Sequence, residues 1–193
     1  MRVLTSVRWL ALLIASAMVA SGFAAPNAFQ RLEIENPQFT HQEVGIFELE
    51  LEKAANFLAI YVYKNFAQPI KAGDNAKRLQ ARRFLSLALH MDPQNITARR
   101  INEMLAEGNA EDLEIPLPQK PKDFVEFLGR LIEQLKTRPE APAKKLAGYL
   151  SLVAADLDPA NEDAVYAAEL FLQKSGDQAS IWKELVVGKA PMP

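Results

Sequence analysis

Apolar side chains recur at spacings of three and four residues over most of the chain, as expected for helices that bury one face. Residues 48–65 show the pattern first, with Leu51, Leu58 and Val62 on one side. Further helices are predicted at about residues 75–91, 95–107, 123–137, 143–157 and 161–174, and a short last one after Asp177. No Asn-Gly or Asp-Gly hairpin signal occurs in the sequence. The pattern predicts an all-α protein of about seven helices.

A four-residue corner separates two of these helices in each half of the chain. It reads Asp-Pro-Gln-Asn at residues 92–95 and, 66 residues later, Asp-Pro-Ala-Asn at residues 158–161. Proline ends the incoming helix because it disfavours the α conformation in the residue before it. Asn95 and Asn161 are then predicted to cap the outgoing helices by accepting a hydrogen bond from a free backbone N–H.

The sequences around the two corners also match. Ala98 and Ala164 each stand three residues after the Asn, and Phe-Leu-Ser-Leu at residues 84–87 is matched by Tyr-Leu-Ser-Leu at residues 149–152. Two corners with matching flanks indicate a duplication, in which each unit stacks on its neighbour to bury its apolar face.

The duplication divides the chain into two predicted units of three helices each, over residues 48–108 and 123–176. Residues 109–122 contain three prolines and predict an extended strap between the units. Residues 25–47 show no clear periodicity for most of their length and predict an extended lead-in. Residues 177–193 predict a capping helix followed by a tail.

The apolar helix that ends in Asp-Pro, followed by Asn and then Ala, resembles the tetratricopeptide repeat family. Residues 84–108 and 149–176 carry the resemblance, whereas the early Trp-Leu-Gly-Tyr signature of the family is missing. The resemblance implies a divergent α-solenoid that binds a protein or peptide on a concave helical surface. It implies no catalysis and no cofactor.

The first 24 residues have the pattern of a signal peptide. Arg2 and Arg8 form a positive region before an apolar run at residues 9–20, and small residues at positions 22 and 24 suit cleavage after Ala24. An uncleaved anchor is the alternative, although the run is shorter than the roughly 20 residues that span a membrane. We therefore expect export to the periplasm or cell envelope. The absence of cysteine excludes disulfides and thiol catalysis.

Charge is distributed unevenly between the two predicted units. Without the two signal-peptide arginines, 20 basic residues face 24 acidic ones, which gives no support to a nucleic-acid partner. Residues 74–102 nevertheless carry a net charge of +4, and residues 140–176 carry −3. The first stretch supplies the candidate partner-binding residues: Arg78, Arg82, Arg83, Arg99 and Arg100. The alternative is that this basic face pairs with the acidic face of the second unit, or with solvent.

Catalytic and metal-binding constellations are poorly represented. The chain has two histidines. His90 and Asp92 together give too few ligands for a metal site. His90 is instead predicted to be a surface residue near a helix C-terminus, where a partial positive charge is favourable. Ser86 and Ser151 lack the Gly-x-Ser-x-Gly context of a nucleophile and are expected to be packing residues. The carboxylates are expected to line solvated helix faces, with paired-acid catalysis as the alternative.

These observations favour an exported, non-enzymatic interaction module that binds a peptide or helix of an envelope partner, with the five arginines steering and orienting it. It would need no metal or cofactor and would meet a membrane only through an uncleaved N-terminal segment. Two alternatives from other classes remain open: an all-α envelope hydrolase that uses paired carboxylates, and a structural solenoid that assembles end to end.

Overall fold

The computed structural model describes residues 28–109 and 115–187. Within these ranges the protein is all-helical and contains no strand. The helices are α1 (His41–Val44), α2 (Glu48–Lys71), α3 (Asn75–Met91), α4 (Ile96–Ala106), α5 (Pro121–Lys136), α6 (Ala141–Leu157), α7 (Glu162–Ser175) and α8 (Gln178–Val187). The all-α prediction is therefore confirmed for the part of the chain that the structure describes.

The two Asp-Pro-x-Asn corners connect α3 to α4 and α6 to α7. The Asn95 side chain accepts a hydrogen bond from the Ala98 N–H at 2.9 Å, and Asn161 does the same for the Ala164 N–H at 3.0 Å. Both asparagines are thus N-caps, as the repeat in the sequence predicts. The caps satisfy backbone donors that the first helical turn leaves unpaired.

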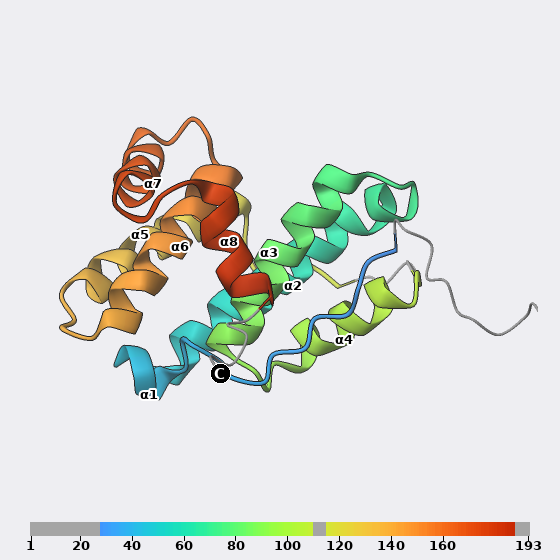
Figure 1. The fold of residues 1–193 in the computed structure, drawn as a ribbon, viewed down its shortest axis with the longest axis horizontal. Coiled ribbons are helices and arrows are strands. Elements are labelled where there is room, and N and C mark those ends of the chain that lie inside the picture. The colour runs from blue at the N-terminus through green and yellow to red at the C-terminus, as the bar shows by residue number, and fades with distance from the viewer. Residues whose placement is uncertain (1–27, 110–114, 188–193) are drawn as a thin grey trace, which may run out of the picture.

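The helices form two groups of three (Figure 1). In the first group α2 packs against α3 and α4, and in the second α6 packs against α5 and α7. Phe57 of α2 and Phe124 of α5 stack with ring centroids 3.6 Å apart and join the groups. Buried side chains from both groups belong to one continuous apolar cluster. Burial of these aromatic rings stabilises the contact between the groups.

Two elements depart from the helices that the sequence predicts. The lead-in contains α1, where the Glu43 carboxylate accepts a hydrogen bond from the Thr40 N–H and Gly45 ends the turn with a φ of 66°. One helical turn is too short to show a period of 3.6 residues. The second element is α2, which continues past Pro69 to Lys71. Proline is tolerated in that last turn because its missing N–H removes a single bond near the helix end.

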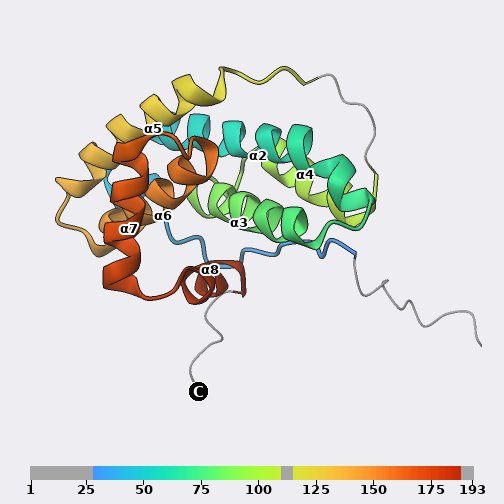
Figure 2. The ribbon, with the colours of Figure 1, turned by 90° about the horizontal axis from the view of Figure 1, so that it is seen from above.

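Helix α8 lies across both groups, beside α3 and next to the path of the lead-in (Figure 2). Its Leu185 carbonyl accepts a hydrogen bond from Ser86 of α3, and its Ile181 carbonyl accepts one from the Tyr149 hydroxyl of α6. Ile181 and Leu185, four residues apart on α8, therefore attach this helix to the second and the first group, respectively. The predicted signal peptide, its cleavage after Ala24 and the C-terminal tail lie outside the described residues.

None of the helices in residues 28–109 and 115–187 combines the length and the apolar character that a membrane crossing requires.

Candidate functional site: an occupied helix pair and an open one

The lead-in is bound along the first group instead of extending into solvent (Figure 1). Asn102 of α4 holds it by a reciprocal pair of hydrogen bonds: Asn102 Oδ1 accepts from the Leu32 N–H, and Asn102 Nδ2 donates to the Leu32 carbonyl, both at 2.9 Å. Asn102 is buried, as are the lead-in side chains Phe29, Leu32 and Phe39. The amide of Asn102 thus satisfies both main-chain groups of one extended residue.

Charged side chains fasten the same segment nearer its start. Arg82 of α3 donates to the Gln30 carbonyl at 2.6 Å, and its guanidinium lies 5.8 Å from the centre of the Phe29 ring. Arg31 of the lead-in forms an exposed ion pair with Glu103 of α4 at 3.0 Å. The α3–α4 pair consequently binds an extended polypeptide segment that belongs to its own chain.

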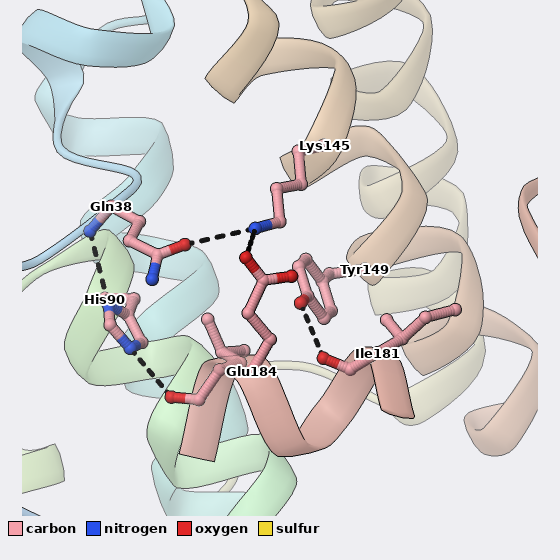
Figure 3. A network of polar contacts seen from close by, with 7 residues as sticks. Gln38, His90, Lys145, Tyr149, Ile181 and Glu184 are labelled. Carbon is pink, nitrogen blue, oxygen red and sulfur yellow. Dashed lines mark hydrogen bonds and ion pairs between the residues drawn. The ribbon is translucent and has the colours of Figure 1, made fainter. Parts of the chain in front are cut away.

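A partly buried junction joins the far end of the lead-in to α3, α6 and α8 (Figure 3). The Gln38 N–H donates to His90 Nδ1 at 3.2 Å, and His90 Nε2 lies 3.0 Å from the Leu185 carbonyl. Because a backbone N–H can only donate, Nδ1 is unprotonated and Nε2 carries the hydrogen. Lys145 of α6 completes the junction by donating to Glu184 at 2.9 Å and to the Gln38 side chain at 3.4 Å.

His90 differs from its prediction as a surface residue, because it is only 2% exposed. α8 and the lead-in cover the end of α3, and neither contact is visible in the sequence around residue 90. Burial lowers the pKa of His90 below its ordinary value, with the Lys145 charge acting in the same direction, while the Leu185 carbonyl and Glu43 oppose the change. His90 is therefore a neutral, structural histidine at neutral pH.

The five arginines proposed from the sequence contact different neighbours. Arg82 holds the lead-in, whereas the guanidinium of Arg83 lies 5.9 Å from the centre of the Trp182 ring on α8. Arg99 donates to Gln94 of its own corner at 3.4 Å, and Arg100 is exposed on α4. Arg78 is half-buried on α3. Burial lowers the pKa of Arg82, and the positive charge of Arg78 acts in the same direction. The observed contacts do not gather the five on one surface.

Part of the basic face instead meets a carboxylate of the second group. Asp156 of α6 accepts a side-chain hydrogen bond from Gln80 and faces the charges of Arg83 and Lys77 on α3. Burial raises the pKa of Asp156, and these three groups oppose that rise. Basic side chains of the first unit thus lie close enough to this one carboxylate of the second unit to act on its charge, as one of the alternatives from the sequence expects.

The second group contains a cavity of about 770 Å³ between α6, α7 and α8. Its apolar surface includes Tyr149 of α6, Leu170 and Phe171 of α7, and Ile181 of α8. Gly148 makes the shape possible, since a Cβ at this position would overlap the Phe171 ring. The absence of a side chain at residue 148 lets α7 approach α6 closely and leaves the ring as a wall of the cavity.

Lysines surround the cavity although the second unit carries net negative charge along the sequence. Lys136 ends α5, Lys144 and Lys145 lie in the first turns of α6, and Lys174 lies in the last turn of α7. Glu184 is the one carboxylate among the described lining residues, and it pairs with Lys145. The cavity therefore combines an apolar wall with a cationic rim. A sum of charges along the chain misses this site because it does not separate the faces of a helix.

The repeat relates the cavity to the surface that holds the lead-in. An offset of 65 residues places Ala147, which lines the cavity, at the position of Arg82. The offset of 66 residues between the corners places Ala168 at the position of Asn102. Two of the side chains that bind the lead-in, Arg82 and Asn102, thus correspond to alanines in the second group. The α6–α7 pair is the open counterpart of the occupied α3–α4 pair.

No group of three metal-ligating side chains occurs among the residues that the structure describes. Ser86 and His90 both reach the Leu185 carbonyl, but α8 seals them from solvent. Ser151 donates to the Ala147 carbonyl of its own helix at 2.9 Å. Both serines are buried, in agreement with the packing role expected from the repeat, and each also donates a hydrogen bond to a backbone carbonyl.

The described residues form an all-α protein with two groups of three helices. The α3–α4 pair holds the lead-in, and the α6–α7 pair borders an open cavity. A scan against family models finds no match, and neither the curated proteins nor the solved structures contain a significant match.

Proposed function

We propose that this chain is an exported, non-enzymatic interaction module of the tetratricopeptide-like kind that binds a polypeptide segment of an envelope partner. The binding site is the cavity between α6, α7 and α8, in place of the arginine cluster of the first unit. Export is supported by the signal-like pattern of residues 1–24.

One observation carries the proposal: the α3–α4 pair already holds an extended polypeptide, residues 28–40, through Asn102 and Arg82. In the related α6–α7 pair, α8 packs against Tyr149 and Lys145 of α6, and a cavity with an apolar wall remains between the three helices. A cavity of 770 Å³ lies within the range of about 300–1,000 Å³ that is typical of ligand sites. The first pair thus provides an intramolecular precedent for what the second pair binds.

The paired-acid hydrolase has less support from the same geometry. Such chemistry requires two carboxylates that face one another across a cleft. Glu184 has no second acid among the described residues of the cavity, and Lys145 neutralises it. End-to-end assembly is a separate alternative that predicts an apparent mass that rises with concentration in light scattering.

A photo-crosslinking amino acid placed in the full chain tests the proposal in cells. Leu170 is 37% exposed and lines the cavity, whereas Leu49 on α2 is 56% exposed and lies away from it, so the second position is the matched control. We expect one saturable protein adduct from position 170 and none from position 49. An absence of adducts from both positions, with the chain correctly exported, would contradict the proposed function.

A further inference from the structure

We propose that the α6–α7–α8 cavity selects an acidic polypeptide segment, one that places an apolar side chain against Phe171 and carboxylates against the lysine rim. This inference rests on the proposed function and specifies the chemistry of the partner. The second unit is negatively charged in total, but the described residues that line its cavity include four lysines and one carboxylate, so the local charge at the cavity is positive.

Part of the positive charge of the rim has no paired carboxylate among the described residues. Lys136 pairs with Glu133 at 2.7 Å and Lys145 with Glu184 at 2.9 Å. Among the described residues, Lys144 and Lys174 take part in no ion pair. They belong to α6 and α7, two of the helices that supply the apolar wall, and both line the cavity. A ligand that carries carboxylates next to an apolar residue matches this arrangement.

The apolar wall determines the second requirement of the ligand. Tyr149 and Ile181 are buried, but Leu170 is exposed and Phe171 is only partly covered. A leucine or phenylalanine side chain of a partner would cover this surface, with roughly 1.5–3 kcal/mol available from full burial of such a side chain. Charge attracts the segment, and the apolar residue anchors it.

A polypeptide fits the site better than a fatty acid, which shares the combination of carboxylate and apolar chain. The cavity lies at the surface between three helices, so an alkyl chain bound there would remain partly in water and lose part of its burial energy. A polypeptide needs only one or two apolar side chains in the cavity. No asparagine or glutamine side chain of the described residues lines the cavity, so recognition depends on the lysines and the apolar wall instead of an amide pair.

Glu184 acts as an internal competitor for such a ligand. Its carboxylate already occupies Lys145 at the edge of the cavity, where Lys145 also reaches Gln38 of the lead-in. An incoming carboxylate therefore competes with Glu184 for the same ammonium group. Removing the charge of Glu184 is expected to strengthen binding, an effect that loss of structure would not produce.

Fluorescence anisotropy with a synthetic probe tests the inference on the chain that starts at residue 25. The probe is a fluorescein-labelled dodecapeptide with a central Leu-Phe pair flanked by Asp and Glu, and its comparison peptide carries Asn and Gln instead. We expect the acidic peptide to bind at least about tenfold more tightly at low salt, with the difference reduced at high salt.

Variants of the rim locate the effect. Lys144→Glu combined with Lys174→Glu is expected to weaken binding of the acidic peptide about tenfold or more, and Glu184→Gln to strengthen it about threefold. The matched control is Lys53→Glu with Lys64→Glu on α2, two exposed lysines outside the cavity. This control should leave affinity within about twofold, and circular dichroism confirms the fold of each variant.

The outcomes separate the inference from the proposed function. Equal binding of the acidic and amide peptides, or equal losses in the rim and control variants, would overturn selection for acidic segments while the crosslink from position 170 could still establish polypeptide binding. Displacement of an apolar fluorescent dye by dodecanoate, with no binding of either peptide, would identify a lipid site and overturn the inference. No peptide binding together with no crosslink would refute both.

Discussion

The α3–α4 and α6–α7 pairs share a corner, an asparagine cap and a ring-Leu-Ser-Leu run, yet one is covered by the chain and the other is open. Asn102 and Arg82 bind the lead-in, and alanine occupies both corresponding positions in the second pair. The two pairs therefore share the same helix ends, while the side chains on their surfaces differ at these positions.

The charged side chains of the two units lie at places that their sequence totals do not indicate. The first unit is basic, but Arg82 is engaged by the lead-in and Arg83 lies against α8. The second unit is acidic, but Asp156 faces the first unit and the lysines surround the cavity. Lys144 and Lys174, which take part in no ion pair among the described residues, consequently line a cavity in the half of the chain whose sequence total is negative. The following predictions test this contrast.

The largest expected effect comes from matched truncations of one phenylalanine in each region. Phe39 of the lead-in is fully buried against Tyr149 at a ring separation of 5.6 Å, so Phe39→Ala should lower the free energy of unfolding by about 3–5 kcal/mol. Phe171 forms the wall of an open cavity, and Phe171→Ala should cost about 1 kcal/mol. Urea unfolding followed by circular dichroism measures both.

Each variant is the control for the other, because both remove the same phenyl ring and differ only in its surroundings. A similar loss in both would show that the cavity wall is packed as tightly as the lead-in, and the contrast between an occupied and an open pair would fail. A large loss confined to Phe39→Ala would identify the lead-in as part of the folded core.

Much of the fold could be predicted because its signals are local. Asn95 and Asn161 cap their helices through bonds to residues three positions away, and an apolar period of 3.6 residues marks each long helix. The exceptions have local reasons as well: α1 is a single turn, and α2 passes Pro69 near its end. The arrangement as a tetratricopeptide-like solenoid remains a prediction.

The candidate site could not be predicted because it depends on contacts between distant segments. Asn102 and Leu32 are 70 residues apart, and His90 and Leu185 are 95 apart. Nothing in the neighbourhood of Arg82 indicates that a carbonyl of the lead-in will occupy it. One local signal was present, since a glycine inside the apolar α6, at residue 148, is typical of close helix approach.

The amide pair of Asn102 provides the next test, with a smaller effect on stability. Asn102→Ala removes both bonds to Leu32 and leaves a buried N–H and carbonyl without partners, which should cost about 2 kcal/mol. Hydrogen exchange should show faster exchange of the Leu32 amide, with α6 and α7 unaffected. Asn65→Ala is the control, because Asn65 is exposed and bonds only to its own helix. Unchanged exchange at Leu32 would mean that other contacts hold the lead-in.

The pH dependence of stability probes the junction that ends the lead-in. Burial lowers the pKa of His90 below its ordinary value of 6.5, so the unfolded chain takes up the proton first as the pH falls. The contribution of His90 is fully present above about pH 6.5 and is lost as the pH falls toward its pKa in the folded chain. Protonation of Nδ1 also breaks the bond from the Gln38 N–H, a loss of about 1 kcal/mol.

Thermal unfolding between pH 7.5 and pH 5 measures this effect in the parent chain and in His90→Gln. The parent should lose stability over that range, and the variant should have a flatter profile. His41→Gln changes an exposed histidine and should keep the parent profile. An identical slope in His90→Gln and the parent would show that the lead-in junction does not respond to this proton.

The smallest expected effect tests whether the first unit retains a binding surface of its own. Arg82→Ala should cost about 1 kcal/mol and speed exchange near Gln30, because it removes the 2.6 Å bond to that carbonyl. Arg100→Ala, on an exposed helix face, should change stability by no more than about 0.5 kcal/mol. Both variants should retain the crosslink from position 170, since neither side chain lines the cavity. If Arg100→Ala abolished that crosslink while its stability stayed unchanged, the exposed face of α4 would have to contact the partner, and the open α6–α7 pair alone could not account for binding.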